Sequence, residues 1–151
     1  LIIYDIQDIG IRSYTYISTM GLAMEAAQER GLEFMVLDRP NPLGLKKIEG
    51  NILSLSFKSF IGRYPIPYVH GLTSGELAKM INEQGWLDGG KCNLKIIKMK
   101  NYNNKIKLSE ELYPFRHIIE KLIEKDGITK FPLVRNNKKF KSNKISSITI
   151  N

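Results

Sequence analysis

The length, composition and charge of the chain limit what it can be. Its 151 residues suit one domain, and a hydrophobic share of 42% is enough to bury a core. The longest apolar stretches, such as residues 34–37, are far shorter than the roughly 20 residues that a membrane-spanning helix requires. The single cysteine, Cys92, excludes an intramolecular disulfide and a cysteine metal cluster, but it does not decide the compartment.

The net charge of +8 is distributed unevenly along the chain. Residues 1–90 carry four Lys and four Arg against four Asp and six Glu, a net charge of −2, whereas residues 91–151 carry a net charge of +10. Nucleic-acid binding through this basic part is the less favoured alternative function, because few aromatic residues accompany the lysines. The pattern breaks near residues 99–104, so we predict two regions, 1–102 and 103–151.

Predicted strands and helices alternate from the start of the chain. Residues 1–5 form a short apolar run that ends in an acid, which is typical of a buried parallel strand. Apolar residues then recur at helical spacing over residues 11–30, and Gly31 lies where a helix C-cap is expected. A second apolar run, residues 33–38, completes a βαβ unit, which predicts an α/β fold with a parallel sheet.

The middle of the chain contains loops, extended segments and a second helix. Two prolines exclude regular structure from residues 39–44, and residues 48–64 are expected to form short strands or irregular coil. Residues 65–70 are predicted to be extended. Thr73 and Glu76 fit a capping box. The remaining predictions are a helix over residues 74–84, a strand over 93–99 and an amphipathic helix over 110–125.

Polar side chains follow three of the predicted extended segments. They are Asp5, Gln7, Asp8 and Arg12 after the first, Asp38, Arg39 and Asn41 after the second, and His70 and Thr73 after the third. If the strands are parallel, all three groups share the edge of the sheet at which ligands bind in α/β proteins. Acids at strand ends suit glycoside hydrolysis, because one carboxyl protonates the leaving oxygen while another group activates water or stabilises an oxocarbenium-like centre.

Each candidate also has a purely structural interpretation. Asp5 could cap a turn, and Asp38 could pair with Arg12 or Arg39. His70 could be a ligand contact, a proton carrier or a loop histidine with satisfied hydrogen bonds. No His or Cys spacing matches a metal site, and there is no phosphate-binding glycine fingerprint, so neither a metal nor a dinucleotide is expected.

Four segments taken together resemble one known family. They are residues 5–16 (DIQDIGIRSYTY), 37–42 (LDRPNP), 49–50 (EG) and 64–77 (YPIPYVHGLTSGEL). In this order and approximate spacing they are similar to the NamZ-type exo-β-N-acetylmuramidases, glycoside hydrolase family 171, earlier catalogued as domain-of-unknown-function family 1343. The resemblance covers residues 1 to about 102.

The resemblance implies a Rossmann-like catalytic domain. In this chain we expect an incomplete parallel sheet with flanking helices, followed by a basic and partly helical tail. The implied activity is the release of N-acetylmuramic acid from the non-reducing ends of peptidoglycan fragments, without a metal or organic cofactor, by a periplasmic or secreted parent protein. The implied partner is a muramic-acid-containing sugar, and a non-catalytic sugar-binding fragment is the alternative.

The polar positions that match the family motifs are the candidate site residues. Asp8, Asp38 and His70 are the candidates for proton transfer or sugar contacts. Arg12 or Arg39 is expected to bind the lactyl carboxylate, because a planar guanidinium suits bidentate pairing. The other matching positions, expected to contact substrate, are Asp5, Gln7, Asn41, Glu49 and Thr73. The family's Glu-His-Gly loop, which resembles a catalytic-acid site, would precede residue 1, so we expect this chain to hold about half of a site.

Overall fold

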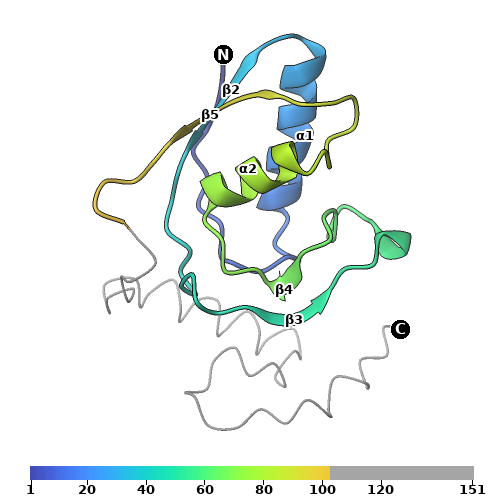
Figure 1. Cartoon of the computed structure of the whole chain (residues 1–151), viewed down its shortest axis with the longest axis vertical. Coiled ribbons are helices and arrows are strands. Elements are labelled where there is room, and N and C mark those ends of the chain that lie inside the picture. Colours follow the sequence, from blue (N-terminus) through green and yellow to red (C-terminus); the bar gives the residue numbers. More distant parts are fainter. Residues whose placement is uncertain (103–151) are drawn as a thin grey trace, which may run out of the picture. The chain divides into compact units, whose positions relative to one another are not determined.

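A computed structural model describes residues 1–102 (Figure 1). Its elements are β1 (Ile2–Tyr4), α1 (Tyr16–Glu29), β2 (Glu33–Leu37), β3 (Glu49–Ile52), the 3-10 turn η1 (Leu55–Phe57), β4 (Pro67–Val69), α2 (Ser74–Glu83) and β5 (Asn93–Ile97). The helix predicted over residues 110–125 and the boundary of the basic region lie outside the described residues. Within residues 1–102 no helix has the length and apolar character needed to cross a membrane.

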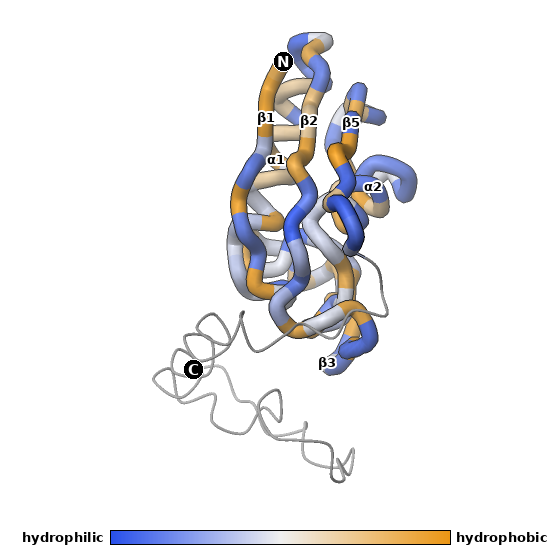
Figure 2. The backbone as a smooth tube through the Cα atoms, turned by 90° about the vertical axis from the view of Figure 1, so that its left-hand side faces the viewer, coloured by the Kyte–Doolittle hydropathy of each residue, from blue (hydrophilic) through white to orange (hydrophobic). Residues whose placement is uncertain are grey.

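Three strands form a parallel sheet in the order β1-β2-β5. Met35 of β2 lies opposite Ile3 of β1 and Lys95 of β5, and both strand pairs run parallel. Figure 2 shows the three strands side by side, and Figure 1 shows α1 and α2 together on one side of them. The predicted α/β class with a parallel sheet and flanking helices is therefore confirmed for the described residues.

The core lies between the sheet and the two helices. Phe34 and Val36 alternate with partly exposed residues along β2, and both are fully buried. They belong to one cluster with Met24 of α1 and with Leu77 and Ile81 of α2. Burying a large apolar side chain contributes about 1.5 to 3 kcal/mol, so this cluster holds the strands firmly against the two helices. The loops that follow β1 and β2 therefore start from fixed positions.

Helix α1 begins five residues later than the apolar spacing predicts. The backbone of residues 10–12 instead runs along β4, where Ile11 forms an antiparallel bridge to Val69. The Arg12 amide also donates to the carbonyl of Tyr68 at 2.7 Å. These contacts hold the segment extended, so pairing with a distant strand overrides the local helical pattern.

The end of α1 is as the sequence predicts. Gly31 has a φ of 61°, a backbone conformation that glycine adopts without strain. The amide of Leu32 donates to the carbonyl of Ala27 at 2.8 Å, and that of Gly31 donates to Gln28 at 3.1 Å. These two bonds form a Schellman motif, which satisfies carbonyls at the helix end and turns the chain into β2.

The extended segment before His70 is not a third parallel strand, which corrects the premise of the sequence analysis. It forms β4, which pairs antiparallel with β3 in a separate two-stranded sheet. A parallel strand after β2 needs a long crossover, usually through an α-helix, and only the short 3-10 turn η1 occurs between β2 and β4. Pro65 and Pro67 also lack backbone donors, which limits regular pairing at the start of β4.

Helix α2 starts with the capping box that the sequence predicts. The Thr73 hydroxyl accepts from the Glu76 amide at 3.1 Å, and the Glu76 carboxylate accepts from the Thr73 amide at 3.0 Å. Two backbone donors at the start of the helix are therefore satisfied. The helix position is fixed at the end that faces the candidate site.

A buried ion pair joins α1 to the segment that precedes β4. Nη2 of Arg63 lies 2.8 and 2.7 Å from the two carboxylate oxygens of Glu25, and the side chains are 13% exposed for Arg63 and 10% for Glu25. The Asp88 amide also donates to Glu25 at 3.1 Å. One carboxylate thus connects three separate parts of the chain.

Replacing Arg63 with Met should lower the free energy of unfolding by about 3 to 5 kcal/mol, because it leaves the Glu25 carboxylate buried without its counter-charge. Chemical denaturation monitored by circular dichroism measures the change. Asp88→Asn is the matched control, since the Asp88 carboxylate also lies near Arg63, at 3.6 Å, but is largely exposed. Its effect should stay below about 1 kcal/mol. Equal losses in the two variants would contradict the argument.

Gly21→Ala should destabilise the protein, although the same change in an ordinary helix position is stabilising by about 1 kcal/mol. A Cβ at Gly21 would overlap the Tyr64 hydroxyl and lie 2.7 Å from Cζ of the same ring. We expect a loss of about 1 to 3 kcal/mol from this overpacking. The exposed neighbour Leu22, changed to Ala, is the control. A higher unfolding midpoint in Gly21→Ala would refute the expected clash.

Candidate functional site

Three loops meet beyond the ends of β1 and β2. The first loop covers residues 5–15, the second covers residues 38–48 and the third covers residues 70–73. The pairing of the first loop with β4 includes a bond from the His70 amide to the Gly10 carbonyl at 3.4 Å. The predicted clusters therefore do come together, although β4 is not part of the parallel sheet. Figure 1 shows the loops at the end of the molecule toward which β1 and β2 run.

Asp38, which directly follows β2, caps the N-terminus of α2. Oδ1 accepts from the backbone amides of Gly75 at 2.7 Å and Arg39 at 3.0 Å, and Oδ2 accepts from the Thr73 hydroxyl at 3.0 Å. A negative charge is favourable at this end of a helix. The alternative in which Asp38 pairs with the guanidinium of Arg12 or Arg39 is not what the structure shows.

Asp8 and His70 form a buried pair between the first and third loops. Asp8 is 5% exposed and His70 is 3% exposed. Nε2 of His70 lies 3.3 Å from Oδ2 of Asp8, but the two atoms are not aligned for a hydrogen bond. Oδ2 accepts from the Gly10 amide at 2.8 Å, and Nδ1 of His70 accepts from the Leu72 amide at 3.2 Å. Because Nδ1 is an acceptor, a neutral His70 carries its proton on Nε2, facing Asp8.

Asn41 connects the second loop to the third and packs against the first. Its Nδ2 donates to the carbonyl of Leu72 at 3.0 Å, and its Oδ1 accepts from the Leu43 amide at 2.9 Å. A Cβ at Gly10 would lie 2.9 Å from Cγ of Asn41, so only glycine allows this approach. Nδ2 and Oδ1 of this buried amide are thus both engaged by the main chain.

Gln7 joins the first two loops at a more exposed position. Its Nε2 donates to the carbonyls of Asp8 at 2.6 Å and Pro40 at 2.8 Å. Together with Asn41, it fixes the path of the proline-containing second loop.

Asp5 and Arg39 form the exposed pair of the cluster. Nε and Nη2 of Arg39 both contact Oδ1 of Asp5, at 2.7 and 2.6 Å, and the side chains are 48% exposed for Asp5 and 40% for Arg39. The hydrogen bond from Arg39 holds the pKa of Asp5 below its usual value, and the same bond raises the pKa of Arg39. Both groups remain charged around neutral pH, facing solvent.

Arg12 and Glu49 lie on the β3–β4 side of the cluster. Nη1 of Arg12 donates to the carbonyls of Asn51 at 2.9 Å and Ile66 at 2.7 Å. Glu49 begins β3, and its carboxylate lies 3.7 Å from the Lys47 ammonium group. Within residues 1–102, no hydrogen bond or ion pair links Arg12 or Glu49 to the acids of the other loops.

Two tyrosines belong to the site region although the sequence analysis did not include them. The ring of Tyr68 lies 5.8 Å from the Arg12 guanidinium carbon, and its hydroxyl lies 2.9 Å from the Ser13 hydroxyl. Burial raises the pKa of the Tyr102 hydroxyl, and the nearby backbone of Asn41 partly offsets this rise. Tyr68 was recognisable as the residue two positions before His70 on the same strand face, whereas no local pattern marks Tyr102.

The arrangement of the three loops defines a class of protein. It is an α/β protein in which polar loops gather beyond the carboxyl ends of parallel strands, as in many α/β enzymes. Among residues 1–102, no set of three or more His, Cys, Asp or Glu side chains is placed to hold a metal ion.

Comparison with known proteins identifies the family. The family described as "Exo-beta-N-acetylmuramidase NamZ, N-terminal" matches residues 1–120, and the chain belongs to it. A curated relative, "Peptidoglycan beta-N-acetylmuramidase NamZ" of Bacillus subtilis (strain 168), is 50% identical over 115 residues. The match covers 76% of this chain and 27% of the relative, so the chain spans about a quarter of that protein.

Two crystal structures of DUF1343 family proteins from Bacteroides fragilis NCTC 9343 are also similar. The first is 56% identical with a TM-score of 0.66, and the match covers 70% of this chain and 27% of that one. The second is 45% identical with a TM-score of 0.66, and the match covers 69% of this chain and 30% of that one. The resemblance stated from the sequence motifs is thus confirmed.

Asp38→Ala should lower the free energy of unfolding by about 2 to 3 kcal/mol, because the change leaves the donors at the start of α2 without their charged acceptor. Denaturant unfolding measures the loss. Asp5→Ala is the control at the end of the neighbouring strand, and it should leave the unfolding midpoint unchanged because Asp5 is exposed. A stable Asp38→Ala variant would show that this carboxylate does not hold the loops.

Proposed function

We propose that the protein containing this chain is an exo-acting β-N-acetylmuramidase, which releases N-acetylmuramic acid from the non-reducing ends of peptidoglycan fragments. The observation that carries the proposal is the meeting of the three polar loops in a chain that belongs to the NamZ N-terminal family. Because this chain spans 27% of the curated relative, the activity belongs to the whole protein. A substrate in the cell wall also favours a periplasmic or secreted location.

In this proposal the buried polar residues give the loops their shape. Both oxygens of Asp38 accept hydrogen bonds from the protein, and Asp8 and His70 are almost completely buried. This supports a positioning role for the three residues, whose assignment as catalytic groups stays a prediction. Displacement of a sugar by about 1 Å can cost a hundredfold in rate, so such positioning matters for turnover.

The exposed polar groups are the ones available to a sugar. Asp5 and Arg39 form a charged pair on the surface of the loops, and the Gln7 side chain lies partly exposed beside them. Hydrolysis also needs a carboxylic acid within reach of the glycosidic oxygen. We place that acid in the part of the protein outside residues 1–102. The chemistry requires water and carboxyl groups, and it needs no metal or organic cofactor.

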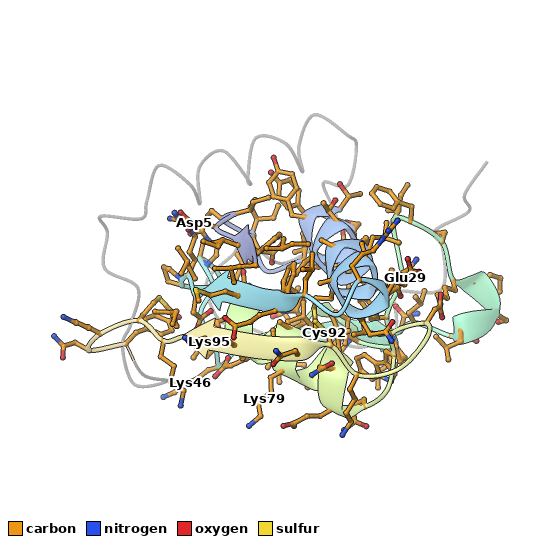
Figure 3. The ribbon with its side chains drawn as sticks, turned by 90° about the horizontal axis from the view of Figure 1, so that it is seen from above. Asp5, Glu29, Lys46, Lys79, Cys92 and Lys95 are labelled. Atoms are coloured by element: carbon orange, nitrogen blue, oxygen red, sulfur yellow. The ribbon has the colours of Figure 1, made fainter. Side chains whose placement is uncertain are left out.

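The complete gene product should release 4-nitrophenol from 4-nitrophenyl N-acetylmuramide, and Asp8→Asn and Asp38→Asn should each lower the turnover at least about tenfold, because the loops lose charged acceptors. Glu29→Gln is the control at the far end of α1, well apart from Asp5 in Figure 3, and it should keep full activity. Wild-type turnover in both Asn variants would remove the site assignment. Absence of any turnover by the wild-type protein would remove the proposed function.

A non-catalytic sugar-binding role is the second candidate for this chain taken by itself. It is favoured by the presence of the three loops in a chain that covers 27% of the curated relative. Calorimetric titration of the 151-residue chain with N-acetylmuramic acid distinguishes it from an inert fragment: heat of binding without turnover of the chromogenic substrate supports the binding role.

A further inference from the structure

The two arginines of the candidate site have different partners. Arg39 is neutralised by Asp5, whose carboxylate oxygen lies 2.6 Å from Nη2 and 2.7 Å from Nε. Arg12 donates to the main-chain carbonyls of Asn51 and Ile66. None of the ion pairs formed among residues 1–102 includes Arg12. Arg12 therefore contributes a positive charge that no carboxylate of the described chain balances.

The Arg12 guanidinium is held in a fixed orientation. Nη1 is anchored by carbonyls from both sides of the β3–β4 hairpin, and the Tyr68 ring lies 5.8 Å from the guanidinium carbon. Burial lowers the pKa of Arg12, although an arginine side chain stays protonated in proteins. The two carbonyl dipoles offset only part of the positive charge on Arg12. The guanidinium has also lost part of its hydration already, so an anion that binds it meets a smaller further desolvation cost.

One edge of the guanidinium is open. Nε and Nη2 of Arg12 have no acceptor among residues 1–102, and neither is among the buried polar atoms without a partner, so both are accessible to solvent. On Arg39, the corresponding Nε and Nη2 atoms both contact the Asp5 carboxylate. Two parallel N–H donors on one planar edge match the two oxygens of a carboxylate.

We propose that the Nε and Nη2 edge of Arg12 binds the lactyl carboxylate of an N-acetylmuramoyl sugar and so distinguishes it from N-acetylglucosamine. This rests on the proposed function, because it deepens the substrate choice of the same site. Arg12 is then the specificity residue, and Arg39 stays with Asp5. The Ser13 and Tyr68 hydroxyls, 2.9 Å apart, supply further polar surface next to the bound group.

Calorimetric titration of the full 151-residue chain with N-acetylmuramic acid, its methyl ester and N-acetylglucosamine tests the proposal. The wild-type chain should bind the acid at least about tenfold more tightly than the ester or N-acetylglucosamine, and added salt should reduce this preference. Arg12→Gln should bind the acid and the ester equally. Arg30→Gln, at the exposed C-terminal end of α1, is the matched control and should keep the preference. Arg39→Gln is measured beside it to separate the two arginines of the site. The ester comparison needs no mutation, so it stays informative if Arg12→Gln does not fold.

Each other result overturns a defined part of the argument. Equal binding of acid and ester by the wild-type chain would remove the role of Arg12 while leaving the sugar site in place. A preference that is lost in Arg39→Gln and kept in Arg12→Gln would assign the carboxylate to Arg39 instead. If the chain binds none of the three ligands, the inference fails, and turnover of the chromogenic muramide by the complete protein then decides separately whether the proposed function also fails.

Discussion

The pairing of the first loop with β4 is the constraint on which the rest of the site depends. Two backbone bonds, from the Arg12 amide to Tyr68 and from the His70 amide to Gly10, align residues 10–12 with the strand. This alignment prevents an earlier start of α1, brings His70 to Asp8 and places Arg12 beside the Tyr68 ring. Main-chain hydrogen bonds from the loop that follows β1 thus determine the position of the two-stranded sheet.

The charged groups of the described chain perform two different tasks. Glu25 and Asp38 each join separate segments by accepting hydrogen bonds from donors in other parts of the chain, so both have a structural role. The Asp5 and Arg39 pair faces solvent and adds little to stability, since exposed ion pairs contribute weakly. Arg12 belongs to neither group. Its Nη1 atom is hydrogen-bonded to the main chain, whereas its Nε and Nη2 atoms have no partner among residues 1–102.

The predictions that succeeded rest on local signals. The C-cap at Gly31 and the capping box of Thr73 and Glu76 depend on residues close in sequence, and both are present. The start of α1 was wrong because Ile11 fits a helical face and a strand equally well, and its partner Val69 is far away in the sequence. The three polar groups were correctly expected to meet, although not through three parallel strands. Side-chain partners, such as Asp5 for Arg39, depend on tertiary geometry that no spacing encodes.

The difference between the two arginines also bears on how a substrate carboxylate can be recognised at low cost. A ligand that binds Arg39 must displace the Asp5 carboxylate or share its donors, so one charge-assisted contact is exchanged for another and the net gain is small. A ligand that binds Arg12 displaces only water from the open edge, and the orientation of the guanidinium is already fixed by Asn51 and Ile66. Preorganisation lowers the entropy lost on binding. In the proposed site, Arg12 is therefore better suited than Arg39 to bind the lactyl carboxylate, the group that distinguishes muramic acid from glucosamine.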